Sequence, residues 1–551
     1  MAQNPDVETM AGPGPGDAVA PGPGTSDGTR KTLNAELKPA TSGRVWRSWA
    51  LRTRTAGHDA FATAPAQVDN GDEARYSDKS GTYTKDVLQS NVGVADSAAY
   101  QSFKAALSSG DPADFEKIVV GGSRTLNGPQ AGLAFYLDSL DGSQYAVPPA
   151  PALASEAYAT ELVELYWASL LRDVAFTAYP ASGEARQAAA ELSSMPTYAG
   201  PRDAANQVTP ELLFRGGLAG ETVGPYVSQF LLQPTALGSL PITQKYITNK
   251  AGEDFMTGPA EFLNVQNGIP TGKSLTPAAV LYLHNGRGLA AYTHDDVLYQ
   301  AYLIAYLVLS TINNGIPAPL NPGNPYIGSK TQNGFGTFGQ PDIAATLVAV
   351  AGKAIREVWY QKWWVHLRHR PESGGAIVYL QKTGQGGTIE GHVSDTVLNS
   401  QAVRVSFKAN NSYFLPQAFP EGSPTHPAYP TGHGAVAGAC ITALKFFFDG
   451  TFAIENPLVP SSDGTATAAY TAPSGEAPLT VNGELHKLAH NISFGHGIHA
   501  GIHWRSDTDT SIQLGEAVAL SHLRDHAHTY NERFRISLTR VDGTSATITN
   551  L

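Results

Sequence analysis

The segment His426-Pro427-Ala428-Tyr429-Pro430-Thr431-Gly432-His433 combines a hydroxyl and two imidazoles with the start of an apolar helix. Proline is excluded from a helix interior and Thr431 is a good N-cap residue, so the apolar run 435–448 predicts a buried helix that starts here. Gly432 lets the backbone approach a ligand closely. Free amide groups at a helix start, with the positive end of the helix dipole, predict an anion site. The alternative is a capped core helix with a hydrogen-bonded histidine.

Cationic residues gather upstream of this segment, at Lys362, Arg368 and Arg370. Lys362 falls on the apolar side of a helix that is predicted to begin at Pro341, and a lysine is seldom buried unless it is paired. Arg370 precedes a proline, which predicts that the helix ends there. The alternative is an exposed helix end, where cations complement the helix dipole.

A third group follows at His496, His499, His503 and Asp507. The three histidines have the spacing of zinc ligands on one helix face. Zinc is not favoured, because glycines at 495, 497 and 501 argue against a stable helix and no acidic residue is placed as a general base. Taken together, the three groups supply cations, backbone amides, imidazoles and a carboxylate. That set suits a multiply charged tetrahedral oxyanion.

Helices must position these groups, because most of the chain carries apolar residues at helical spacing. The predicted helices are 45–61, 97–107, 153–176, 209–232, 297–312, 341–370, 435–448, 485–494 and 512–523. Segments 313–340, 374–405 and 461–482 are rich in Gly, Pro and polar residues and are predicted to be loops. Residues 1–42 have a Gly- and Pro-rich composition that predicts a flexible arm.

The composition narrows the classes of function. A hydrophobic content of 42% predicts a globular protein with a large core, and a net charge of −11 argues against nucleic acid or an anionic membrane as the main partner. The single cysteine, Cys440, excludes an internal disulfide and predicts a buried, inert thiol. The longest apolar stretch, 297–309, is shorter than the ~20 residues of a membrane span. No signal peptide is recognisable, so the default expectation is a cytoplasmic protein.

The ordered motifs resemble a known family. Lys362, Arg370-Pro371, Pro430-Thr431-Gly432-His433, and His503 with Asp507 four residues later resemble the signature of the vanadium-dependent haloperoxidases and of their relatives, the type-2 phosphatidic acid phosphatases. Segments 70–76, 362–372 and 426–430 resemble the bromoperoxidases of red algae and bacteria. The resemblance extends over most of the chain after about residue 45.

The resemblance implies a vanadate cofactor and a role for each motif residue. His503 would bond the vanadium, Lys362 and Arg370 would hold its oxygens, and the Thr431 hydroxyl and Gly432 amide would donate hydrogen bonds. His433 would be the acid–base group, with Lys362 and His426 as further catalytic residues. Asp507 would orient His503 or pair with a nearby cation.

Two positions depart from the family pattern. Thr431 stands where the family has serine, and Gly497 stands where it has an arginine six residues before the vanadium ligand. With one inserted residue, His496 takes the place of that arginine. His426 predicts oxidation of bromide and iodide rather than chloride, although Trp359 is more typical of chloroperoxidases. The resemblance also implies calcium near Phe338, Gln340 and Asp342, for which a plain helix start is the alternative.

The prediction is a mainly α protein of two packed helical bundles, with an arm at 1–42 and one large domain at 43–551. Its N-terminal bundle would span about 43–340 and its catalytic bundle about 341–551. Hydrogen peroxide would oxidise bromide to a hypohalous species that halogenates a small organic substrate. The alternatives are an acid phosphatase that uses the same site and a relative that binds oxoanions without turnover. A homo-oligomer built from dimers, up to a dodecamer, is expected.

Overall fold

The computed structural model describes residues 44–312 and 315–551, so the predicted arm at 1–42 lies outside the described residues. The chain falls into two units, Met1–Ala62 with Leu137–Ser139, and Thr63–Tyr136 with Leu140–Leu551. The first contains α2 (Arg44–Ala60). The second contains every predicted site residue.

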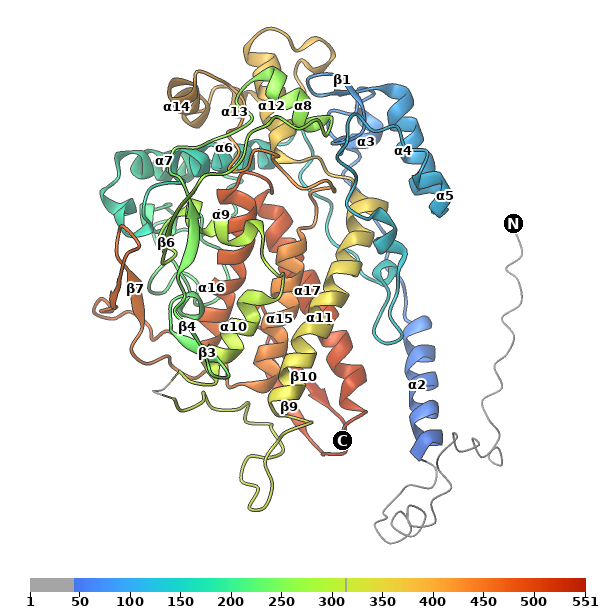
Figure 1. The fold of residues 1–551 in the computed structure, drawn as a ribbon, viewed down its shortest axis with the longest axis vertical. Coiled ribbons are helices and arrows are strands. Elements are labelled where there is room, and N and C mark those ends of the chain that lie inside the picture. Colours follow the sequence, from blue (N-terminus) through green and yellow to red (C-terminus); the bar gives the residue numbers. More distant parts are fainter. Residues whose placement is uncertain (1–43, 313–314) are drawn as a thin grey trace. The chain divides into compact units, whose positions relative to one another are not determined.

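The second unit is mainly helical, as predicted, and its strands form two-stranded antiparallel pairs (Figure 1). Its α-helices are α3 (Asp72–Arg75), α4 (Ser97–Ser109), α5 (Pro112–Phe115), α6 (Glu156–Leu171), α7 (Gly183–Ser193), α8 (Pro259–Gln266), α9 (Gly286–His294), α10 (Gln300–Leu309), α11 (Gln340–Tyr360), α12 (Pro371–Lys382), α13 (Asp395–Leu398), α14 (Gln401–Asn410), α15 (Gly432–Phe447), α16 (Val481–Phe494) and α17 (Arg505–Ala527). Its strand pairs are β1 (Gln89–Asn91) with β2 (Val94–Ala95), β3 (Thr235–Leu237) with β4 (Leu240–Ile242), β5 (Tyr246–Asn249) with β6 (Pro277–Leu281), β7 (Leu458–Pro460) with β8 (Thr467–Ala469), and β9 (Arg535–Thr539) with β10 (Ser545–Thr549). None of the described helices is long and apolar enough to cross a membrane.

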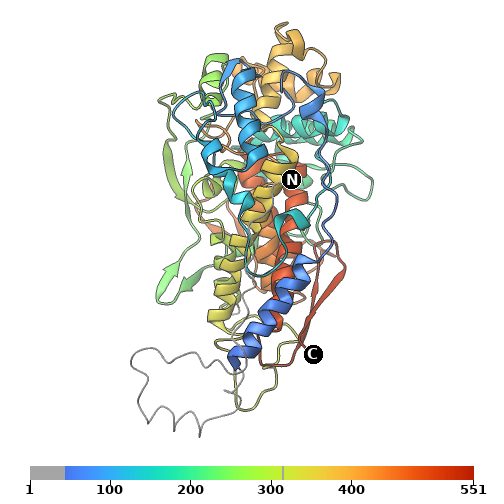
Figure 2. The same cartoon turned by 90° about the vertical axis from the view of Figure 1, so that its right-hand side faces the viewer.

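The core is centred on α15, which is buried along its whole length and packs on α11, α16 and α17 (Figures 1 and 2). Small residues allow α15 and α17 to touch through their backbones. A Cβ added to Gly438 would lie 2.0 Å from the Ile512 carbonyl oxygen, and one added to Gly515 would lie 1.9 Å from that of Ala435. Any larger residue would force the two helices apart. This contact fixes the start of α15 relative to the start of α17.

Two predicted elements are wrong. Segment 209–232, predicted to be a helix, forms only the short 3-10 turns Pro210–Leu212 and Gln229–Leu231. Its Gly and Pro residues prevent a continuous helix, and its apolar residues are buried one by one from an irregular backbone. Segment 374–405 is not loop-rich, since it contains most of α12 and all of α13. Gly374 is a close-contact position rather than a helix breaker, because a Cβ there would lie 2.9 Å from the Trp504 ring.

The cationic segment also differs from its prediction as one helix up to Arg370. α11 ends at Tyr360 and continues as a π-helical turn, Gln361–His366, after which Leu367 adopts a left-handed conformation with φ of 44°. Arg370 is the N-cap of α12, with Pro371 in the first turn of that helix. Proline at this position begins the new helix because its missing N–H is not needed there.

Candidate active site

The predicted site residues come together at the ends of α11, α12, α15 and α17. The Nη1 atom of Arg370 lies 2.7 Å from Nε2 of His503, and its Nη2 atom lies 3.0 Å from Nδ1 of His426. The Lys362 ammonium donates to the carbonyl oxygens of Pro427 and Ala428, at 2.7 and 2.9 Å. Segments more than 130 residues apart therefore meet at one place, with the π-helical turn carrying Lys362 into it.

The two cations of this site are buried and form no ion pair with a carboxylate of the described residues. Lys362 is fully buried and Arg370 almost so, and within the described part of the chain their hydrogen bonds go only to carbonyl oxygens and imidazole nitrogens. Burial, followed by the charge of Arg370, holds the pKa of Lys362 well below its usual range. Burial also lowers the pKa of Arg370 to about 10. Because buried charges are ordinarily paired, this arrangement calls for an anion.

Asp507 sets the tautomer of His503. Its Oδ2 atom accepts from Nδ1 of His503 at 2.8 Å and from the backbone N–H of Trp504 at 3.0 Å. A carboxylate can only accept, so the Nδ1 atom carries the hydrogen and the lone pair of His503 lies on Nε2, facing Arg370. Burial, with Arg370 and Lys362, holds the pKa of His503 well below its usual range. His503 therefore presents a neutral nitrogen that can bind a metal.

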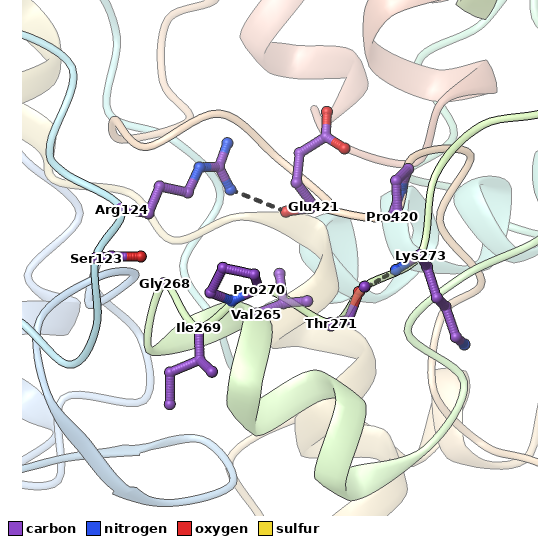
Figure 3. Close-up of a pocket in the computed structure, with 11 residues that line it drawn as sticks. Ser123, Arg124, Val265, Gly268, Ile269, Pro270, Thr271, Lys273, Pro420 and Glu421 are labelled. Carbon is purple, nitrogen blue, oxygen red and sulfur yellow. Dashed lines mark hydrogen bonds between the residues drawn. The ribbon is translucent and has the colours of Figure 1, made fainter.

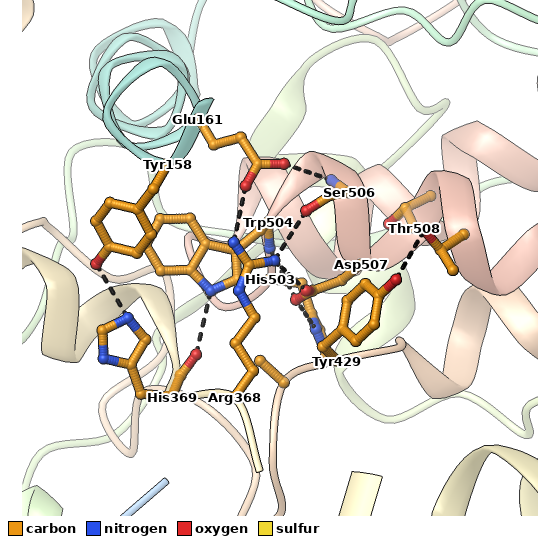
Figure 4. A network of polar contacts seen from close by, with 12 residues as sticks. Tyr158, Glu161, Arg368, His369, Tyr429, His503, Trp504, Ser506, Asp507 and Thr508 are labelled. Carbon is orange, nitrogen blue, oxygen red and sulfur yellow. Dashed lines mark hydrogen bonds and ion pairs between the residues drawn. The ribbon is translucent and has the colours of Figure 1, made fainter. Parts of the chain in front are cut away.

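Arg368 completes this network, seen in Figure 4. Its Nη1 atom donates to Oδ1 of Asp507 at 2.7 Å, and its Nη2 atom donates to Glu161 on α6 at 2.8 Å. Its guanidinium also lies over the Trp504 ring, 4.7 Å from the centroid. Asp507 thus contacts both His503 and a neighbouring cation.

The start of α15 supplies further donors. Thr431 is the N-cap residue, and its Oγ1 atom is buried with no hydrogen-bond partner among the described residues. Its own backbone N–H donates to the Asp507 carbonyl oxygen at 3.1 Å, which ties α15 to α17. The hydroxyl therefore does not cap its own helix, and it is available with the following amide groups for a ligand.

His433 is held by a residue that the sequence analysis missed. Its Nε2 atom lies 2.9 Å from Oδ1 of Asp296, so the imidazole N–H donates to this carboxylate. Asp296 lies in the loop between α9 and α10, 137 residues before His433. No pattern in the sequence marks it, because one acidic residue in a loop is ordinary. His433 retains 8% exposure whereas Lys362 retains none, so His433 is the less deeply buried of the two.

His496 lies in the site, as its position in the sequence suggested. Its ring stacks on His433 with centroids 3.8 Å apart and lies 5.6 Å from the His503 ring. The Nδ1 atom of His496 is buried without a partner among the described residues. Burial and the charges of His433, His503 and Arg370 hold its pKa well below its usual range. A side chain at Gly497 would instead crowd His503, whose Cβ would lie 3.0 Å away.

His426 and Trp359 form one wall of the site. Their rings lie 4.6 Å apart, and the Trp359 indole N–H donates to the Asn127 carbonyl oxygen. Burial, with Arg370 and Lys362, holds the pKa of His426 well below its usual range, so its ring is neutral. The two residues on which the halide prediction depends are therefore neighbours.

Other candidates are placed elsewhere. His499 hydrogen-bonds the Tyr226 hydroxyl at 2.9 Å within an aromatic cluster, so the three histidines do not form a zinc site. Arg505 pairs with Glu164. The carboxylate oxygens of Asp342 accept from the Phe338 backbone N–H and the Tyr530 hydroxyl, while Gln340 and Asp342 lie in the first turn of α11. These contacts favour a plain helix start over the calcium site.

The residues present fit a tetrahedral oxoanion such as vanadate. Lys362 and Arg370 are cations without a described carboxylate partner, and Thr431 is an orphaned donor at a helix start. The lone pair of His503 is fixed toward Arg370. The two cations and the Thr431 donor would suit phosphate as well. A neutral, oriented imidazole beside them suits an anion with a metal at its centre.

Comparisons with known proteins agree with this geometry. The family model described as the VCPO second helical-bundle domain matches residues 343–532. A vanadium-dependent bromoperoxidase of Corallina officinalis is 34% identical over 478 residues, 76% of this chain and 78% of that protein. One of Ascophyllum nodosum is 31% identical over 517 residues, 88% and 89% of the two chains. The homohexameric structure of the second vanadate-dependent bromoperoxidase (AnII) from Ascophyllum nodosum aligns with a TM-score of 0.85 at 26% identity, covering 95% of this chain and 96% of that one. The chain belongs to the family of vanadium-dependent haloperoxidases.

Proposed function

We propose that this chain is a vanadate-dependent bromoperoxidase, in which hydrogen peroxide oxidises bromide to a hypobromous species that halogenates organic compounds. The observation that supports this most strongly is the pair of buried cations, Lys362 and Arg370, with no carboxylate partner among the described residues. They lie beside a helix start and beside Nε2 of His503, the nitrogen that can bind a metal and that here accepts a hydrogen bond from Arg370. The relatives from Corallina and Ascophyllum are bromoperoxidases, which agrees with this assignment.

Each residue has a role in holding the cofactor. Lys362 and Arg370 would balance the charge of the oxoanion and donate to its oxygens, and the Thr431 hydroxyl and Gly432 amide would donate as well. The Nε2 atom of His503 would be the protein ligand to vanadium. The chemistry that bound vanadate supplies is Lewis-acid activation of hydrogen peroxide toward the halide.

His433 would move the proton that the reaction requires. Bromide, hydrogen peroxide and one proton give hypobromous acid and water, so a group must release or accept a proton at the reacting oxygen. Asp296 holds the His433 ring by its Nε2–H, which keeps its orientation fixed. His426 and Trp359 would line the side from which bromide approaches.

Reconstitution with orthovanadate tests this function. Protein prepared without vanadate should brominate monochlorodimedone only after orthovanadate is added. Inorganic phosphate should compete with that activation, because it has the same shape and charge. Hydrolysis of p-nitrophenyl phosphate by the vanadate-free protein, together with no bromination after reconstitution, would instead identify a phosphatase.

The assembly belongs to the same proposal. The Ascophyllum protein that aligns with this chain is a homohexamer. We infer that this chain is also a homo-oligomer, with the dimer-based or dodecameric form as the specific prediction. Light scattering coupled to size-exclusion chromatography measures the number of subunits directly.

A further inference from the structure

A cavity of about 450 Å³ has none of the proposed oxoanion-binding residues in its lining (Figure 3). It is formed by residues 123–124, by the segment from α8 to Lys273, and by Pro420 and Glu421. Its size falls in the range of ordinary small-molecule sites, roughly 300–1,000 Å³. A cavity of this size accepts an aromatic ring with a few substituents.

The lining combines an apolar surface with cations. Val265, Ile269, Pro270 and Pro420 supply the apolar part. Arg124 and Lys273 supply positive charge, and in Figure 3 they stand on opposite sides of the cavity. Within the described part of the chain, the Arg124 guanidinium makes one hydrogen bond, from Nη1 to the Glu421 carbonyl oxygen at 3.1 Å, so its other N–H groups are available to a ligand.

The carboxylate of Glu421 in the lining is already compensated. One of its oxygens lies 2.5 Å from Nε2 of His294. Burial opposes protonation of this imidazole, but the hydrogen bond and the charge of Glu421 outweigh it and raise the pKa of His294. Lys273 pairs with Glu261 at 2.8 Å but remains about half exposed. The cavity therefore retains positive charge at Arg124, which favours an anionic group on its occupant.

The cavity is joined to the active site by shared contacts. The Lys85 ammonium donates to the Glu421 carbonyl oxygen at 2.8 Å and to the Glu372 carboxylate at 2.7 Å. Glu372 is two residues after Arg370, and it also accepts from Gln266 at the end of α8. A single buried ammonium nitrogen thus links a wall of the cavity to the segment that carries Arg370.

Buried polar groups near the cavity wall and near Arg370 lack partners among the described residues. Asp86 is fully buried, and neither of its carboxylate oxygens has a partner among the described residues. A Cβ on Gly268, in the cavity wall, would lie 3.0 Å from one of them. The Tyr83 hydroxyl is likewise buried without a partner in the described part of the chain, and it lies close enough to Asp86, Arg370 and Arg124 for their charges to act on it. Such groups are ordinarily met by water, so the surroundings of the cavity wall and of Arg370 are polar.

We propose that this cavity binds the organic acceptor of the halogenation, and that the acceptor is an electron-rich aromatic compound with an anionic group received by Arg124. This inference rests on the proposed function, because hypobromous acid must come from the neighbouring site. In the transfer step the aromatic carbon attacks bromine, the O–Br bond breaks and a C–Br bond forms. The ring proton and the released hydroxide leave as water, so the acceptor carbon is oxidised by two electrons and bromine is reduced.

A matched pair of acceptors tests the cavity. 4-Hydroxybenzoate carries the anion, and 4-hydroxybenzamide is its neutral analogue of nearly the same shape. Equilibrium dialysis against vanadate-free protein measures binding without turnover. A charge-assisted hydrogen bond to a partly exposed arginine should favour the carboxylate by about tenfold. Arg124→Gln should remove most of that preference, and Lys273→Gln should reduce it less.

The control is Arg186→Gln, which removes the same charge from an exposed arginine on α7 and should leave the preference unchanged. In the vanadate-loaded enzyme the KM ratio of the two acceptors should move with the dialysis result. A general effect of the Arg124 substitution on the vanadate site would act on both acceptors alike, so the ratio isolates the cavity. An unchanged preference in Arg124→Gln, or no saturable binding by the wild type, would overturn the proposal. Binding as expected in a protein that oxidises no bromide would overturn the proposed function and the acceptor role with it, while the anion preference of the cavity would stand.

Discussion

The pH dependence of vanadate binding should reveal that His496 takes the place of the family's arginine. Without an anion, burial and the charges of His433, His503 and Arg370 hold the pKa of His496 well below its usual range, so the ring is neutral near pH 7. A bound oxoanion would raise that pKa, because it favours the charged form of a buried group beside it. Binding of vanadate would then carry a proton onto His496.

This proton uptake determines the direction and the size of the change in vanadate affinity with pH. Between the low pKa of the free protein and the higher pKa of the complex, affinity falls by up to about tenfold for each pH unit of increase. The bond that the protonated ring makes is worth about 1.5–3 kcal/mol, or roughly ten- to a hundredfold in affinity. His496 would therefore compensate well for the missing arginine in mildly acidic solution, and poorly above the pKa that His496 has in the complex.

Calorimetric titration with orthovanadate between about pH 5.5 and about pH 8.5 measures the effect. Comparison among variants cancels the titrations of vanadate and Lys362, which every variant shares. His496→Arg should bind more tightly and lose the extra slope. His496→Ala should bind about ten- to a hundredfold more weakly at the acidic end, with the same loss of slope. His528→Ala, at an exposed position after α17, is the matched control. If His496→Ala binds vanadate as the wild type does at every pH, the imidazole does not contribute and the reasoning is wrong.

Four further predictions concern the same site. His503→Ala should abolish bromination and vanadate binding, whereas His433→Ala should keep vanadate and lose about 10²–10⁴-fold in kcat, as equilibrium binding and steady-state rates will show. Asp296→Asn should keep vanadate and lower kcat by about tenfold, because the neutral amide holds the His433 ring less firmly than the carboxylate does. Bromide and iodide should be oxidised and chloride hardly at all, given the neutral His426 beside Arg370, and equal chlorination and bromination of monochlorodimedone would contradict this. Dialysis against a calcium chelator should leave Tm unchanged, because hydrogen bonds occupy the oxygens of Asp342, and a fall in Tm would restore the calcium site.

The site could be predicted from the sequence because its chemistry lies in short motifs. Thr431, Gly432 and His433 sit at a helix start that Pro430 marks, and the pairing of His503 with Asp507 is local. The sequence could not show the backbone conformation of the segments that carry Lys362 and His496. Lys362 and His496 both lie in π-helical turns, and no periodicity signals a π-helical turn within a run of helical residues.

Contacts between residues far apart in the sequence could not be predicted either. Asp296, in the loop between α9 and α10, accepts a hydrogen bond from His433, and Glu161 on α6 accepts one from Arg368. Each is a single acidic residue in ordinary surroundings. The wrong prediction for 374–405 has a related cause, since glycines that break an isolated helix are required where α12 packs against Trp504.

The distribution of buried carboxylates explains why the site is positive only where an anion would bind. Three cations lie within nine residues, at Lys362, Arg368 and Arg370, and all are buried. Arg368 contacts both Glu161 and Asp507, and although burial alone would lower its pKa, these two carboxylates raise it. Arg368 is thus a permanently charged but neutralised support for Asp507. Lys362 and Arg370 contact no carboxylate of the described residues, so burial leaves them destabilised until an anion arrives. A carboxylate placed beside Lys362 would therefore occupy the position of the oxoanion.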